Sequence, residues 1–170
     1  MTTLDIKIYP DEVLRQKTEL VTEFSKELHQ FLDNMAETMY SANGVGLAAP
    51  QVGVLQRITV IDVSEEGNDL MEFINPQIIA REGKVPSEEG CLSIPDFRDK
   101  IFRAETVTVE AVNRHGEPFS VEADELLAIC LQHEIDHLEG VLFIDHLTRL
   151  KKDMFKRKWK KRLLEAEASA

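Results

Sequence analysis

The spacing of apolar side chains predicts two helices in the first quarter of the chain. Between residues 26 and 42 apolar positions recur every three or four residues, as they do along one face of an amphipathic helix. Ser25 is suited to cap the start of this helix, and the Asn43-Gly44 pair is suited to end it. A shorter helix is predicted over residues 10–16.

The middle of the chain shows the pattern of β-strands. Residues 57–63 are rich in β-branched side chains and predict a strand, and residues 71–75 predict a second one more weakly. Residues 106–112 and 118–123 alternate apolar and polar positions on either side of the turn-forming sequence Asn-Arg-His-Gly at 113–116. This arrangement is typical of an antiparallel hairpin.

Two further helices are predicted in the last third. Asp124 is suited to cap a helix from about residue 125 to residue 138, and Gly140 follows its end. Residues 148–167 predict a terminal helix. The order of elements favours an α+β fold, with antiparallel sheets packed around the central helix and a C-terminal helix outside.

No repeat or flexible linker divides the 170 residues, so we expect one domain. Residues 1–147 would form its catalytic body, and residues 148–170 a peripheral basic helix of the same domain.

The sequence HEIDH, residues 133–137, is the strongest chemical signal. Two histidines four positions apart on a helix point the same way, so His133 and His137 can share one cation. Glu134 would stand beside a water on that cation and exchange protons with it. The alternative is a charged helix face that spells the motif by chance.

A catalytic metal site generally has three protein ligands and one open position, so a third ligand is needed. His146 lies beyond the end of the helix, and Cys130 is too far along the helix axis for its short side chain. Cys91, in a loop closed by a proline, is a candidate. Either Glu88 or Glu89 would instead give a site of two histidines and one carboxylate.

Three segments together resemble one family. GVGLAAPQ at 44–51, EGCLS at 89–93 and QHEIDH at 132–137 are similar to the three motifs of bacterial peptide deformylases, in the same order and at similar spacing. The resemblance covers nearly the whole chain, and the combination is far more specific than HExxH alone.

This resemblance implies that Cys91, His133 and His137 bind the metal and that Glu134 is the catalytic acid and base. It also implies three groups that hold the substrate: the Gln51 side chain, the backbone N–H of Leu92 and the backbone of Gly46. The implied walls of a methionine pocket are formed by Val45, Leu126, Ile129, Cys130 and His133. Arg98 is implied to lie beside the site and to pair with Glu89.

The implied activity is hydrolysis of the formyl group from the N-terminal formyl-methionine of newly synthesised polypeptides, with release of formate. The implied native metal is Fe²⁺, with Zn²⁺, Ni²⁺ or Co²⁺ as substitutes; the residues alone do not choose among them. A peptidase or amidase using the same chemistry and a non-enzymatic structural metal site remain as alternatives.

Charge is distributed unevenly along the chain. From Arg149 onward there are nine Lys and Arg residues and three acids, a net +6, whereas the whole chain carries −11 and the preceding part therefore −17. One interpretation is a solvated helix whose apolar side chains pack inward, namely Leu150, Met154, Phe155, Trp159 and Leu163. The other is an electrostatic anchor for ribosomal RNA.

Two cysteines and an N-terminus without a signal-peptide pattern predict reduced thiols and a cytoplasmic location. No apolar run is long enough to span a bilayer, so a membrane is not expected as a partner. DNA is not expected as a partner either. The expected partners are formyl-methionyl nascent peptides and, through the basic helix, the ribosome.

Overall fold

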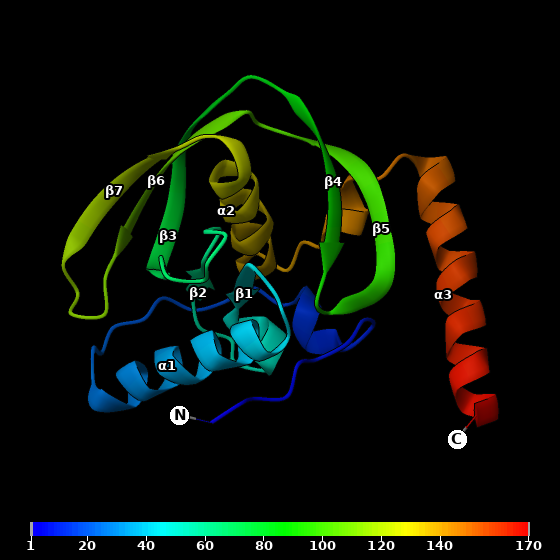
Figure 1. Ribbon diagram of the computed structural model, residues 1–170, viewed down its shortest axis with the longest axis horizontal. Helices are drawn as coiled ribbons and strands as arrows, with labels where there is room; N and C mark the ends of the chain where they lie inside the picture. The colour runs from blue at the N-terminus through cyan, green and yellow to red at the C-terminus, as the bar shows by residue number, and fades with distance from the viewer. Residues whose placement is uncertain (1, 170) are drawn as a thin grey trace.

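Two antiparallel sheets enclose one central helix in the computed structural model, which describes residues 2–169 (Figure 1). The helices are α1 (Lys26–Ser41), α2 (Glu125–Leu138) and α3 (Arg149–Ser169), with short 3₁₀ turns at Glu12–Arg15, Ala49–Val52 and Phe143–His146. The strands are β1 (Gly46–Ala48), β2 (Ile58–Ile61), β3 (Met71–Glu82), β4 (Val85–Cys91), β5 (Ile94–Arg103), β6 (Thr106–Val112) and β7 (Pro118–Ala123).

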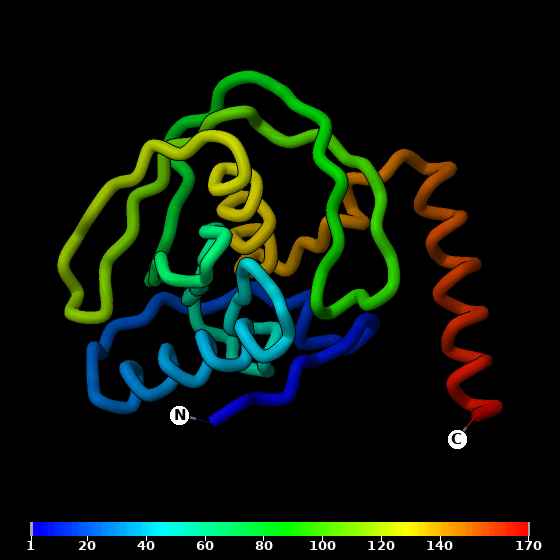
Figure 2. Tube along the Cα trace, in the orientation of Figure 1, coloured from blue at the N-terminus to red at the C-terminus, as the bar shows by residue number. Residues whose placement is uncertain are grey.

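The larger sheet has five strands in the order β1-β2-β3-β6-β7, and the smaller is the β4–β5 hairpin. Every pairing between these strands is antiparallel. Helix α2 lies between the sheet and the hairpin, α1 runs beneath β1 and β2, and α3 stands outside β5 (Figures 1 and 2). The predicted α+β architecture around the HEIDH-bearing helix is therefore confirmed.

Local sequence signals account for the ends of the helices. The Ser25 side chain accepts a hydrogen bond from the N–H of Leu28 at the start of α1. Asn43, just beyond its end, has a positive φ of 58°, a conformation that asparagine tolerates better than most residues. Asp124 precedes α2 as predicted, but its side chain makes no capping hydrogen bond.

The sequence pattern places Cys91 in a loop closed by Pro95 and predicts no strand on either side of it. In the structure Cys91 ends β4, and β4 and β5 form a hairpin in which Val85 lies opposite Arg103. Two other strands differ as well, since β1 was not predicted and β3 continues to Glu82 rather than ending at residue 75. The predicted hairpin at 106–123 is confirmed, with β6 and β7 in register from Val107–Ala123 to Val112–Pro118.

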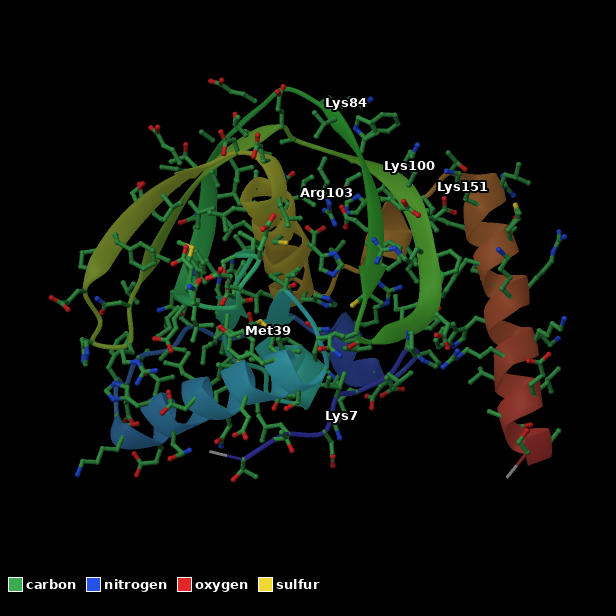
Figure 3. All side chains as sticks on the ribbon, viewed as in Figure 1. Lys7, Met39, Lys84, Lys100, Arg103 and Lys151 are labelled. Atoms are coloured by element: carbon green, nitrogen blue, oxygen red, sulfur yellow. The ribbon has the colours of Figure 1, made fainter. Side chains whose placement is uncertain are left out.

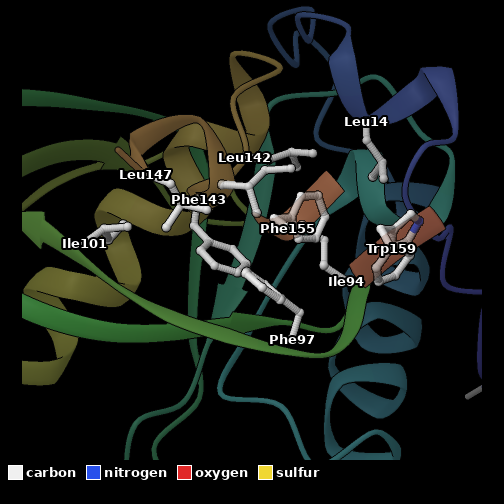
Figure 4. Packing of buried hydrophobic residues seen from close by; sticks show 10 residues of the cluster. Leu14, Ile94, Phe97, Ile101, Leu142, Phe143, Leu147, Phe155 and Trp159 are labelled. Carbon is white, nitrogen blue, oxygen red and sulfur yellow. The ribbon is translucent and has the colours of Figure 1, made fainter. Parts of the chain in front are cut away.

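Helix α3 packs on the outer side of the β4–β5 hairpin through two aromatic residues. Phe155 and Trp159 are 2% and 6% exposed and join a cluster with Ile94, Phe97 and Phe143 (Figure 4). The Phe97 and Phe155 rings meet edge to face with centroids 4.6 Å apart. The expectation that Leu150, Met154 and Leu163 also pack inward is wrong, because these side chains are 70%, 46% and 43% exposed.

Among residues 2–169, the structure contains no helix that combines the length and apolar character needed to cross a bilayer.

Replacing Trp159 with Ala should lower the free energy of unfolding by about 3 kcal/mol, the usual cost of removing a buried tryptophan. Leu150→Ala is the matched control, since this side chain is 70% exposed and its loss should cost under about 0.5 kcal/mol. Chemical denaturation followed by circular dichroism measures both, because the variant loses the only tryptophan. Equal midpoints for the two variants would show that α3 does not stabilise the body.

Candidate active site

Helix α2 presents four side chains in one stripe to a cleft. Leu126, Ile129, Cys130 and His133 follow the i, i+3, i+4, i+7 spacing of one helix face, and all four line the cleft. His137 lies one turn beyond His133, and the two imidazole rings are 5.1 Å apart. The helix therefore places both histidines of HEIDH side by side on one face, as the spacing predicted.

The end of β4 brings Cys91 to these histidines. The hairpin register shifts between Gly90 and Cys91, which turns the chain at this point. The Cys91 Sγ lies 3.3 Å from His137 Nε2. One ligand atom from each of Cys91, His133 and His137 lies within 4.8 Å of the others, the only such group of His, Cys, Asp and Glu found in residues 2–169.

The other candidate ligands do not join this group. Cys130 is buried, and burial raises the pKa of its thiol to about 12, which leaves it protonated and unreactive. His146 bonds instead to Asp136, with 2.9 Å between Nε2 and Oδ2. Glu89 contacts Nδ1 of His133 and does not join the three ligand atoms. Glu88 is exposed on the wall of the cleft.

A buried ion pair holds the first histidine in place. His133 Nδ1 lies 2.9 Å from Glu89 Oε1, so its Nε2 is left for a metal. The Arg103 guanidinium donates two hydrogen bonds to Glu89, at 2.8 and 2.9 Å, and a third to Asp136 at 2.7 Å. Burial alone would raise the pKa of Glu89, but the bonds from Arg103 and His133 lower it to about 2.

The expected pairing of Arg98 with Glu89 is therefore wrong. Arg98 and Arg103 differ by five positions on β5, so their side chains leave opposite faces of the strand. Arg98 lies at the cleft and donates to the backbone oxygen of Glu88 at 3.2 Å. Arg103 points inward between α2 and the hairpin (Figure 3).

Sequence reasoning missed Arg103 and Ser93. Once β5 is known, alternation provides a signal for the first, because Phe97, Ile101 and Arg103 all occupy inward positions with little exposure. Ser93 is fully buried and accepts a hydrogen bond from Gln51 Nε2 at 3.2 Å. No spacing signal in the sequence links it to Gln51.

Glu134 is buried against the backbone of Gly46. A Cβ atom on Gly46 would lie 2.5 Å from Glu134 Oε2, so only glycine leaves room for the carboxylate there. Glu134 is 5% exposed, and this burial raises the pKa of its carboxyl group to about 7. A carboxyl group with such a pKa can both accept and release a proton near neutral pH.

The amide of Gln51 faces the same group of ligands. Its Oε1 accepts a hydrogen bond from the N–H of Ala48 at 3.0 Å, which fixes the orientation of the side-chain amide. Its Nε2 consequently lies 3.5 Å from Cys91 Sγ. Leu92 directly follows Cys91 at the turn of the hairpin and lines the cleft.

The cleft has a volume of about 1140 Å³ and lies between the β4–β5 hairpin, the segment before β1, and α2. Except for His137, which is 1% exposed, every residue that the resemblance assigned to the site lines this cleft. Val45 and Leu126 are 44% and 48% exposed at its mouth. These apolar side chains would be covered by a ligand of similar character.

The donor set fits a divalent transition metal. A thiol and two imidazoles are ligands that Fe²⁺ and Zn²⁺ both accept, and three of them leave a position open. Within residues 2–169, four buried side-chain polar atoms have no hydrogen-bond partner, and two of them, His137 Nδ1 and Glu134 Oε1, belong to this site. Most buried polar atoms in folded proteins are hydrogen-bonded, so a bound ion or water would suit the free oxygen of Glu134.

The chain is similar to known proteins along nearly all of its length. A family model described as polypeptide deformylase matches residues 3–153. A peptide deformylase of Thermodesulfovibrio yellowstonii is 51% identical over 94% of this chain and 98% of its own. One from Pseudoalteromonas translucida is 52% identical over 98% of this chain and 100% of its own.

The fold agrees with a solved structure. The crystal structure of a peptide deformylase from Legionella pneumophila matches 97% of this chain and 98% of its own, with a TM-score of 0.91 and 45% identity. The resemblance in the three motifs is confirmed by this agreement in sequence and fold. The chain belongs to the polypeptide deformylase family of hydrolases.

Proposed function

We propose that the chain hydrolyses the formyl group from the N-terminal formyl-methionine of newly synthesised polypeptides in the cytoplasm and releases formate. The observation that carries this proposal is the meeting of Cys91, His133 and His137 beside the buried carboxylate of Glu134 in an apolar-walled cleft. Three side chains that could bind a metal, a buried carboxylate and an apolar-walled cleft lie together, which supports this proposal.

Cys91, His133 and His137 would hold one divalent metal ion, with Fe²⁺ as the native ion and Zn²⁺, Ni²⁺ or Co²⁺ as substitutes. When bound, such an ion lowers the pKa of a coordinated water and supplies hydroxide near neutral pH. The Glu89 carboxylate orients His133 for this role, and its own charge is held by Arg103.

Glu134 would move the proton. Its carboxylate takes a proton from the attacking water and delivers it to the amine that leaves when the formyl C–N bond breaks. The pKa of about 7 suits both steps, because neither protonation state is strongly favoured near neutral pH. The close approach of Gly46 keeps the carboxylate from turning away from the cleft.

Gln51 and Leu92 would hold the formyl oxygen. Negative charge develops on this oxygen during attack, and hydrogen-bond donors fixed in advance stabilise it. The Gln51 amide is fixed by Ala48 and Ser93 with its N–H group toward Cys91. One donor of this kind typically contributes about 3 kcal/mol to the transition state.

The methionine side chain would occupy the space between Val45, Leu126, Ile129 and Cys130, all on the cleft. The rest of the peptide would extend along β1, which lies at the edge of the five-stranded sheet. Main-chain hydrogen bonds to a strand edge do not depend on side chains. This suits an enzyme that must accept many different polypeptides.

Metal analysis coupled to a formate assay tests the proposal. The chain purified without oxygen should contain one iron per molecule and release formate from a formyl-Met tripeptide. A chelator should abolish the activity, and Fe²⁺ should restore it, because the proposed nucleophile is a water activated by the metal. Activity in metal-free protein, or cleavage of a peptide bond in the matching acetyl-Met tripeptide, would contradict it and favour a different hydrolase.

Replacing Glu134 with Ala should leave metal content unchanged and lower kcat by about 10³-fold or more, the range for loss of a general acid and base. Metal content should be unchanged because Glu134 is not one of the three residues whose ligand atoms lie together. Glu125→Ala, an exposed change on the same helix, should retain activity. Turnover that persists in Glu134→Ala would remove the proposed proton carrier.

We propose further that α3 binds ribosomal RNA through its outer face, where Lys156, Arg157, Lys160 and Lys161 are exposed. A truncation is unsuited to test this, because it would also remove the buried Phe155 and Trp159. The face of α3 that carries Phe155 and Trp159 packs on the β4–β5 hairpin, which leaves the basic face free for phosphates.

The triple variant Lys156→Gln, Arg157→Gln, Lys160→Gln should weaken ribosome binding about tenfold and flatten its dependence on salt, since fewer counterions are released. Activity on short formyl peptides should not change. Lys17→Gln, Lys26→Gln, Arg81→Gln removes the same charge from exposed positions elsewhere and serves as the control. Sedimentation with ribosomes over a salt series measures this; equal losses in both variants would leave α3 without a specific role.

A further inference from the structure

The segment between α1 and β1, residues 43–46, touches all three parts of the site. A Cβ atom on Gly44 would lie 2.7 Å from the Leu92 side chain, so the segment packs closely on the turn after Cys91. Gly46 packs on Glu134 in the same way, and Val45 lines the cleft. The path of these four residues therefore sets the distance between the methionine pocket and the reacting groups.

The backbone of this segment is fixed at both ends. At the α1 end, the N–H of Gly44 donates to the Met39 oxygen at 2.9 Å. At the β1 end, the N–H of Asp62 donates to the Val45 oxygen at 2.8 Å. The position of Asp62 thus determines where the carbonyl of Val45 lies.

Asp62 is itself a buried junction, with 3% exposure. Its Oδ1 accepts from the N–H of Ser64 at 3.0 Å and from its hydroxyl at 2.5 Å. Its Oδ2 accepts from the N–H of Asp69 at 3.2 Å and from Tyr40 Oη at 2.6 Å. Ser64 and Asp69 belong to the loop that follows β2, so the Tyr40 bond is the one that joins this junction to α1.

Tyr40 and Asp62 do not line the cleft. They connect the last turn of α1 to the end of β2, behind the segment that carries Val45 and Gly46. A hydrogen bond to a charged acceptor is among the stronger kinds in proteins. In this bond the acceptor, Asp62, is 3% exposed, whereas the donor, Tyr40, is 39% exposed. Because the N–H of Asp62 holds the Val45 oxygen, we expect the effect of this bond on substrate binding to act through residues 43–46.

We propose that Tyr40 and Asp62 are positioning residues that hold the Val45 wall of the methionine pocket at its working distance from Glu134 and the metal ligands. The inference rests on the proposed function, because it assigns these residues to substrate binding at that site. Tyr40 contacts no ligand of the metal group, so its loss leaves metal binding intact and acts on the fit of the methionine side chain.

The test compares Tyr40→Phe with wild type in the full-length, metal-loaded protein. KM for a formyl-Met tripeptide should rise about fivefold with kcat changed less than about twofold, the pattern expected when binding alone is lost. Metal content should be unchanged. Amide hydrogen exchange at residues 43–47 and at Asp62, measured without substrate, should speed up about tenfold.

The control is Tyr9→Phe, which removes the same hydroxyl from the only other tyrosine. Its ring packs against Phe155 and Trp159, away from residues 43–46, so KM and exchange should match wild type. Unchanged KM and exchange in Tyr40→Phe, or equal changes in both variants, would overturn the inference. If the wild-type chain releases no formate, the proposed function fails, and the exchange result alone decides the positioning role.

Discussion

The carboxylate of Glu89 joins the β4–β5 hairpin to helix α2. It belongs to the β4–β5 hairpin, yet it bonds to His133 of α2, and Arg103 holds both it and Asp136 of the same helix. An ion pair this deeply buried is stable only while every partner is present. The hairpin that carries Cys91 and the helix that carries the histidines are thereby set at one distance. The geometry of the proposed metal site depends on this contact.

The other contacts around the cleft also connect one of the three sequence motifs to another. Gln51 is held by Ser93 of the hairpin, Gly46 lies against Glu134, and Gly44 lies against Leu92. Three segments far apart in sequence are thus packed on one another without a flexible joint between them. Such rigidity suits the proposed reaction, in which hydrogen-bond donors must already be in place when negative charge develops on the substrate oxygen.

The parts of the site that the sequence predicted are those whose geometry is local. HEIDH lies on one helix, so its spacing alone placed His133 and His137 together. Cys91 remained one of several third ligands until the resemblance singled it out, because its partners are more than forty residues away. The β4–β5 strands escaped prediction because proline, glycine and acids make up most of β4, and because β5 carries a proline and five charged residues. These strands are stabilised by their pairing with each other and by the packing of Phe97 and Ile101 in the core. Neither contact can be read from the β-propensity of a single segment.

The shortness of β1 has a consequence for how the protein behaves in a crowded cell. A bare strand edge is open to any other exposed edge, and long flat ones promote aggregation. The five-stranded sheet has two edges, and the one formed by β1 is only three residues long. So few peptide groups cannot pair along the whole length of a strand from another folded sheet. The β1 edge is therefore better suited to a short extended peptide than to self-association through this edge.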